Sequence, residues 1–112
     1  MPSKIVVVVH PDSKARILLR TALESRGLAV ATDHSCADLL EWRSDLRPDL
    51  VLVDRSLIDR DGVDLLSEIS RKWVETQTMV LPQDLAPASL ASLLAIVDRL
   101  LGMRSTQAIL AV

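Results

Sequence analysis

The chain alternates short, uninterrupted apolar runs with longer segments in which apolar residues recur at helical spacing. Four segments, at residues 5–9, 28–31, 50–54 and 78–81, are continuously apolar rather than at every second position, apart from Asp54 at the end of the third and Thr78 at the start of the fourth. Continuous runs of this kind are typical of parallel strands that helices cover on both faces. The pattern therefore predicts four strands in a parallel sheet.

The segments between these runs are predicted to be helices. The first helix follows Pro11, with Asp12 or Ser13 as its N-cap, and ends at Gly27; the second begins at Ser35. A polar loop is expected after residue 54, and a third helix opens at Asp61 and Gly62. The expected inner positions are Ala15, Leu18, Leu19, Ala22 and Leu23 in the first helix, Cys36, Leu39 and Leu40 in the second, and Val63, Leu66, Ile69 and Trp73 in the third.

This alternation of strand and helix predicts a single α/β domain over residues 1–112, built on a doubly wound parallel sheet with right-handed crossovers. Only about thirty residues remain after Leu81. They predict one helix, over residues 87–101, which begins at Pro87 and ends at Gly102. An apolar tail over residues 108–112 follows.

The last helix carries two adjacent apolar stripes, which together cover roughly half of its circumference. A surface helix that packs against a single core needs a narrower apolar stripe. We expect the second stripe either to cover a core left open by a missing element or to contact a second subunit or a partner. The second interpretation makes residues 84–112 a dimerisation segment, and the tail a strand for an unpaired sheet edge, its own or a neighbour's. The predicted interface residues are Leu93, Ile96, Leu100, Met103, Ile109 and Leu110.

The composition of the chain argues against several classes of protein. The formal net charge is −2, without a large basic cluster, so we expect no nucleic-acid partner. The single cysteine fits a reducing cytoplasm, and no apolar run approaches the roughly 20 residues that cross a bilayer. Gly-rich phosphate loops, metal-ligand clusters and nucleophile elbows are absent from the sequence, which argues against an enzyme.

Asp54 is the principal candidate for chemistry, because it ends the apolar run LVLVD at the carboxyl edge of the expected sheet, where ligands of such sheets bind. LVLVD, with DG seven residues later, and the segments KIVVVV and HPDSKARILLRTALESRG together resemble a response-regulator receiver domain. The resemblance covers about residues 4–81. It implies that Asp54 is the phosphoacceptor, that two acids after the first strand help to hold Mg²⁺, and that a hydroxyl residue and a lysine follow the fourth and fifth strands.

Three of these four features are missing. His10 and Pro11 stand where the acid pair is expected, and Pro82 replaces the hydroxyl residue. The lysine has no counterpart, although Arg55 and Arg60 could supply positive charge. Asp12 could join Asp54 as a metal ligand if the loop shifts, so Mg²⁺ remains a weak possibility and no other cofactor is expected.

The resemblance indicates a stand-alone receiver in a two-component phosphorelay, one element short at its C-terminal end and homodimeric. It would act through contacts with a sensor histidine kinase or another signalling protein, with a degraded phosphoacceptor site at Asp54. The alternative is a scaffold or adaptor that kept the fold, lost the switch and binds its partner as a dimer.

Overall fold

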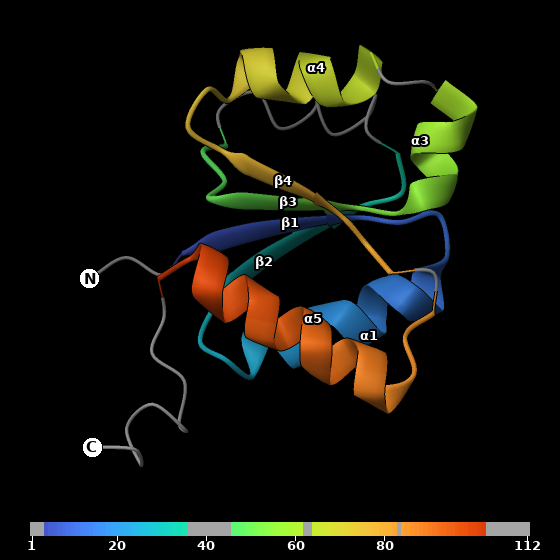
Figure 1. The fold of residues 1–112 in the computed structure, drawn as a ribbon, viewed down its shortest axis with the longest axis vertical. Coiled ribbons are helices and arrows are strands. Elements are labelled where there is room, and N and C mark those ends of the chain that lie inside the picture. Colours follow the sequence, from blue (N-terminus) through green and yellow to red (C-terminus); the bar gives the residue numbers. More distant parts are fainter. Residues whose placement is uncertain (1–3, 36–45, 62–63, 83, 103–112) are drawn as a thin grey trace.

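Four parallel strands form the centre of the molecule. The computed structural model describes residues 4–35, 46–61, 64–82 and 84–102. The strands are β1 (Ile5–Val9), β2 (Ala29–Asp33), β3 (Leu50–Val53) and β4 (Gln77–Val80), in the order β2-β1-β3-β4 (Figure 1). All three neighbouring pairs are parallel. The predicted doubly wound parallel sheet is confirmed, with β2 and β4 each within two residues of the expected position.

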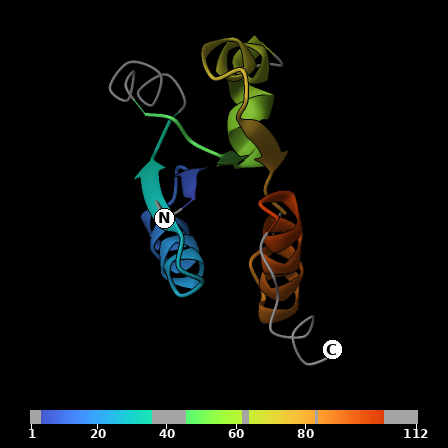
Figure 2. The same cartoon turned by 90° about the vertical axis from the view of Figure 1, so that its left-hand side faces the viewer.

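Helices cover both faces of the sheet. α1 (Ser13–Glu24) and α5 (Pro87–Leu100) lie against one face, and α3 (Arg55–Asp61) and α4 (Asp64–Lys72) against the other (Figure 1). Figure 2 shows the same division from the side, with α1 and α5 together below the strands. This arrangement explains why the central strands are apolar at every position, since each successive side chain enters a core.

The two cores are built from alternate residues of β1 and β3. On the side of α1 and α5, side chains from these strands pack with Leu19, Leu23, Leu93 and Val97. On the opposite side they pack with Leu57, Ile69 and Trp73. All eight strand residues that divide between the two cores are completely buried: Val6, Val8, Leu50 and Leu52 on the first side, and Val7, Val9, Val51 and Val53 on the second.

The segment after Asp54 differs from the expected polar loop, because residues 55–61 form the short helix α3. Leu57 anchors this helix in the second core with 1% of its surface exposed, and Ile58 packs beside it. The Leu57 amide also donates to the Asp54 carbonyl at 3.1 Å, which starts the first turn. Two adjacent apolar residues in a charged segment were too weak a pattern to predict a helix.

α1 follows the expected pattern except at one position. Asp12 is its N-cap, and Ala15, Leu19 and Leu23 are buried. Leu18, predicted to face inward, has 43% of its surface exposed. A helix turns by about 100° per residue, so Leu18 falls on the flank of the stripe that residues 15, 19 and 23 form.

The resemblance left two ways in which the fold could be one element short: the helix and strand expected after the fourth strand are deleted, or the final helix is missing. α5 lies on the face that α1 covers, beside α1, and both contribute to the same core (Figure 1). In the described part of the chain the sheet ends at β4, and the helix that follows lies on the face of α1. This arrangement agrees with the first alternative.

One ion pair fastens α5 to the turn that follows α1. The guanidinium of Arg26 donates to the carboxylate of Asp98, whose side chain is 8% exposed. Gly27 stands next to Arg26 with φ +82°, a left-handed conformation that glycine adopts without strain. This turn thus fixes both the end of α1 and the lateral position of α5.

Several expectations fall on residues outside the described ranges. These are the second helix with Cys36, Leu39 and Leu40, the inner position Val63, and the tail residues Met103, Ile109 and Leu110. Over the described ranges, none of the helices combines the length and the apolar character that crossing a membrane requires.

The packing of α5 predicts how the stability responds to truncation of its side chains. Leu93 is 1% exposed, so Leu93→Ala should lower the free energy of unfolding by about 2–5 kcal/mol through lost burial and the cavity left behind. Leu18→Ala, the same change at a position 43% exposed, should cost less than about 0.5 kcal/mol. Urea denaturation followed by circular dichroism measures both values. Equal losses at the two positions would contradict this placement of α5.

Candidate functional site

The candidate site lies at the carboxyl edge of the sheet, where β1 and β3 end side by side. Val9 pairs with Val53, and the Asp54 amide donates to the Val9 carbonyl at 3.0 Å. His10 follows Val9, so the two residues leave adjacent strands at the same level. Their side chains are mostly buried, 16% exposed for His10 and 15% for Asp54.

His10 contacts the carboxylate of Asp54 directly. Its Nε2 lies 3.2 Å from Asp54 Oδ1. On the other side of the ring, the Asp12 amide donates to His10 Nδ1 at 3.0 Å, so Nδ1 is the accepting nitrogen and Nε2 carries the hydrogen. The Arg16 guanidinium donates to the His10 carbonyl at 2.6 Å and holds the backbone of this loop. The local contacts therefore hold the Nε2 edge of the imidazole against the carboxylate of Asp54.

Ser56 engages the second oxygen of the same carboxylate. Both the hydroxyl and the amide of Ser56 donate to Asp54 Oδ2, the amide at 3.2 Å. An aspartate followed two residues later by a serine often forms a local turn. In this turn the carboxylate accepts hydrogen bonds from the free backbone amides at the start of a helix. Asp54 thus starts α3 as well as ending β3. Sequence reasoning missed Ser56, although the Asp-x-Ser spacing was a usable signal.

Asp12, the other predicted metal ligand, has a structural role. Its side chain accepts the Lys14 amide at 3.2 Å as the N-cap of α1, and the residue is exposed. In the part of the chain that the structure describes, no three His, Cys, Asp or Glu side chains are grouped so that they could hold a metal ion.

The donor set at Asp54 does not fit Mg²⁺. This ion prefers an octahedron of hard oxygen ligands, usually one or two carboxylates and several waters. Here the Nε2 of His10 lies against one carboxylate oxygen and Ser56 donates to the other, while Asp12 caps a helix. An imidazole in contact with the carboxylate occupies the space beside Oδ1 that a cation would need.

The remaining predicted positions lie around this edge, and those whose side chains are described do not complete a cationic site. Arg55 is exposed at the start of α3, and the side chain of Arg60 lies outside the described residues. Lys14 begins α1 at this edge but is exposed, and the other two lysines of the sequence, Lys4 and Lys72, precede β1 and β4 at the opposite edge. Pro82 follows β4 and is half-buried against α5, with no side-chain donor to offer.

The predicted interface residues on α5 separate into two groups. Leu93 is buried in the core and Leu100 packs half-buried against it, so these two side chains cover the sheet rather than form a surface. Ile96 is 36% exposed and remains available for contact. The reason is the rotation of α5, which turns Leu93 and Val97 inward and leaves Ile96 at the margin.

Comparison with known proteins identifies the family that the sequence resembles. Residues 6–95 match the model of the response regulator receiver domain. The KDP operon transcriptional regulatory protein KdpE of Escherichia coli K12 is 32% identical over 76 residues, which are 68% of this chain and 33% of that protein. The DNA-binding transcriptional regulator NtrC of the same strain is 36% identical over 72 residues, which are 64% of this chain and 15% of that protein. The chain thus spans a third or less of these relatives.

A solved structure agrees in fold over most of its length. A response regulator from Thermotoga maritima superposes with a TM-score of 0.74 at 18% identity, over 90% of this chain and 99% of that one. At this identity the likeness shows the fold alone, and the family match covers β1 to α5. The chain belongs to the response regulator receiver domain family of two-component signalling.

Proposed function

We propose that this receiver domain transmits its signal through contacts with other proteins, and that Asp54 is a degraded phosphoacceptor site. A sensor histidine kinase or another signalling protein is the proposed partner. The observation that carries the proposal is the pair of contacts that occupies Asp54, His10 Nε2 on one oxygen and the Ser56 hydroxyl on the other.

The charge requirement of phosphoryl transfer supports this proposal. A phosphoryl group that moves onto a carboxylate carries negative charge on three oxygens, which metal ions and cationic side chains normally offset. The His10 ring, held by the Asp12 amide, places Nε2 3.2 Å from the Asp54 carboxylate, where a divalent ion would contribute two charges. The stabilisation of the transition state is correspondingly smaller.

The state of the nucleophile supports it as well. A carboxylate oxygen must approach the phosphorus in line with the leaving group. Each Asp54 oxygen already has a close neighbour, because Oδ1 lies 3.2 Å from His10 Nε2 and Oδ2 accepts hydrogen bonds from Ser56. Ser56 lies in the first turn of α3, and its amide donates to Oδ2. Releasing Oδ2 would therefore remove a contact that caps this helix. Phosphorylation of Asp54 would therefore require the loss of a hydrogen bond that caps α3. Control through protein binding alone leaves this hydrogen bond in place.

Incubation with acetyl phosphate and Mg²⁺ tests the proposal chemically. We expect the intact mass to stay unchanged, because the described residues around Asp54 supply neither a metal site nor a counter-cation. A gain of about 80 Da, the mass of one phosphoryl group, that Asp54→Asn abolishes would overturn the proposal. A receiver domain with the complete set of acids, hydroxyl and lysine serves as the positive control for the reagent.

Restoring the missing acids should restore metal binding. The double variant His10→Asp with Pro11→Asp places carboxylates at the positions that the family uses, and removes the imidazole from Asp54. At ten times its dissociation constant, Mg²⁺ would stabilise the variant by about 1.4 kcal/mol, which raises the melting temperature by several degrees. Wild-type protein should show no such rise.

The control for this experiment is the same double variant combined with Asp54→Asn, in which the effect of Mg²⁺ should disappear. A wild-type melting temperature that rises with Mg²⁺ as much as that of the double variant would show that His10 leaves the metal site intact.

A further inference from the structure

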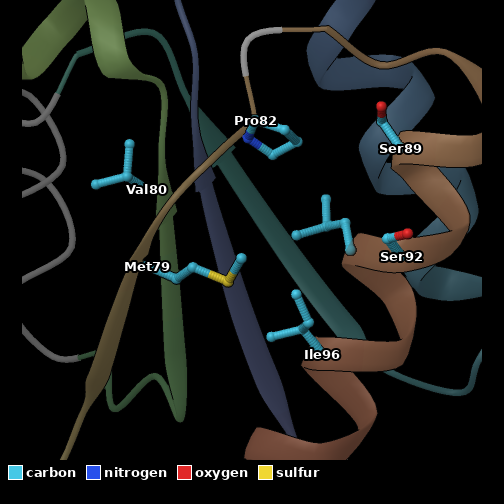
Figure 3. Close-up of a pocket in the computed structure, with 7 residues that line it drawn as sticks. Met79, Val80, Pro82, Ser89, Ser92 and Ile96 are labelled. Atoms are coloured by element: carbon cyan, nitrogen blue, oxygen red, sulfur yellow. The ribbon is translucent and has the colours of Figure 1, made fainter.

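The outer side of β4 is an open sheet edge beside an apolar groove. In the described part of the chain β4 pairs with β3 alone. Next to it a cavity of about 280 Å³ opens between β4 and α5. Figure 3 shows Met79 of β4 and Ile96 of α5 facing each other across this groove, with Pro82 at one end.

The size and chemistry of the groove suit side chains of a protein segment. Pockets for small molecules usually have volumes of roughly 300–1,000 Å³ and several convergent polar groups. This groove is smaller, with Met79, Leu93 and Ile96 among its walls, and its side-chain polar groups are the hydroxyls of Ser89 and Ser92. A strand that paired with the edge of β4 would place alternate side chains into it.

The chain itself carries a segment of suitable length at a suitable place. The side-chain amide of Gln77 (Nε2) donates to the Leu100 carbonyl at 2.8 Å, so α5 ends beside the first residue of β4. Ten residues follow Gly102, and all those after Arg104 are uncharged and end in the apolar sequence AILAV. At about 3.3 Å per residue, ten residues reach roughly 33 Å, which exceeds the length of β4.

Handedness argues that this tail does not pair with its own β4. The chain moves from β1 to β2 through α1 on one face, and from β3 to β4, in the opposite direction, through α4 on the other face. A strand beyond β4 that was reached through α5 would continue in the direction from β3 to β4, but with its helix on the face of α1. That crossover has the opposite hand to the other two, and parallel crossovers share one hand in about 98% of cases.

The antiparallel alternative within one chain is also unfavourable. The tail starts at the amino end of β4, so it would first have to run the length of the strand and then turn back. Residues 103–112 contain none of the Gly, Pro, Asn or Asp residues that favour a tight turn. Pairing with another molecule removes both difficulties.

We propose that the edge of β4 and the groove beside α5 bind residues 106–112 of a second copy of this chain. Two copies exchange their tails about a two-fold axis, which gives a closed dimer in which each open edge is paired. The dimer does not depend on Asp54, so it stands or falls separately from the proposed function.

Mixed cysteine variants distinguish an exchanged tail from one that folds back. On a Cys36→Ser background, one chain carries Ile96→Cys and a second carries Ile109→Cys; the two are mixed, unfolded, refolded together and oxidised. We expect a covalent dimer of the two different chains on a non-reducing gel. An Ile17→Cys chain is the matched control, because Ile17 is 65% exposed on α1, away from the groove, and should give no comparable product.

A single chain that carries both Ile96→Cys and Ile109→Cys reports on the alternative. An intramolecular disulfide in this chain, with no covalent dimer, would show that the tail pairs with its own edge and would overturn the proposal. The absence of any cross-link in either experiment would overturn it too.

Light scattering on the unmodified chain gives an independent readout. The full chain should have twice the mass of the 12.3 kDa monomer, and both a chain that ends at Gly102 and the variant Ile96→Asp should have the mass of one. Circular dichroism establishes that each variant is folded. A full-length monomer, or a dimer that survives loss of the tail, contradicts the exchange; a dimer that survives Ile96→Asp but not loss of the tail contradicts the groove.

Discussion

The pairing of β1 with β3 determines what the site can do. Val9 lies opposite Val53, and the hydrogen bond from the Asp54 amide to the Val9 carbonyl continues the ladder by one more residue. The residue that follows Val9 therefore lies beside Asp54. In this chain it is a histidine, and its ring lies against the oxygen that a metal ion would otherwise share. The contact between His10 and Asp54 follows from the residue at position 10 and the register of the two strands.

Coverage of the sheet imposes the second constraint. β1 and β3 are buried on both faces, so both faces need helices, and in the described part of the chain one helix follows β4. That helix covers the face of α1, where Leu93 and Val97 complete the core. As a consequence, the outer edge of β4 lacks a neighbouring strand in the described structure. The same shortening thus explains the completed core and the open groove.

The sequence was sufficient for the strands and for the limits of α1 and α5, since continuous apolar runs, Gly27, Pro87 and Gly102 are strong signals. It was not sufficient for the rotation of α5. Apolar residues cover about half of that helix, so periodicity could not say that Leu93 would be buried and Ile96 left at the surface.

The candidate site, too, could be predicted from the sequence only in part. His10, Pro11 and Pro82 indicated from the sequence that the family's metal and hydroxyl positions had changed. That the ring of His10 would contact Asp54 depended on the register of β1 and β3, and the role of Ser56 depended on α3, which the sequence pattern did not predict.

A crystal structure determined in the presence of Mg²⁺ tests the central claim most directly. The contacts described here predict that His10 Nε2 stays within hydrogen-bond distance of Asp54 Oδ1 and that no ion lies between Asp54 and Asp12. A magnesium ion coordinated by both carboxylates, with the imidazole turned away, would contradict it.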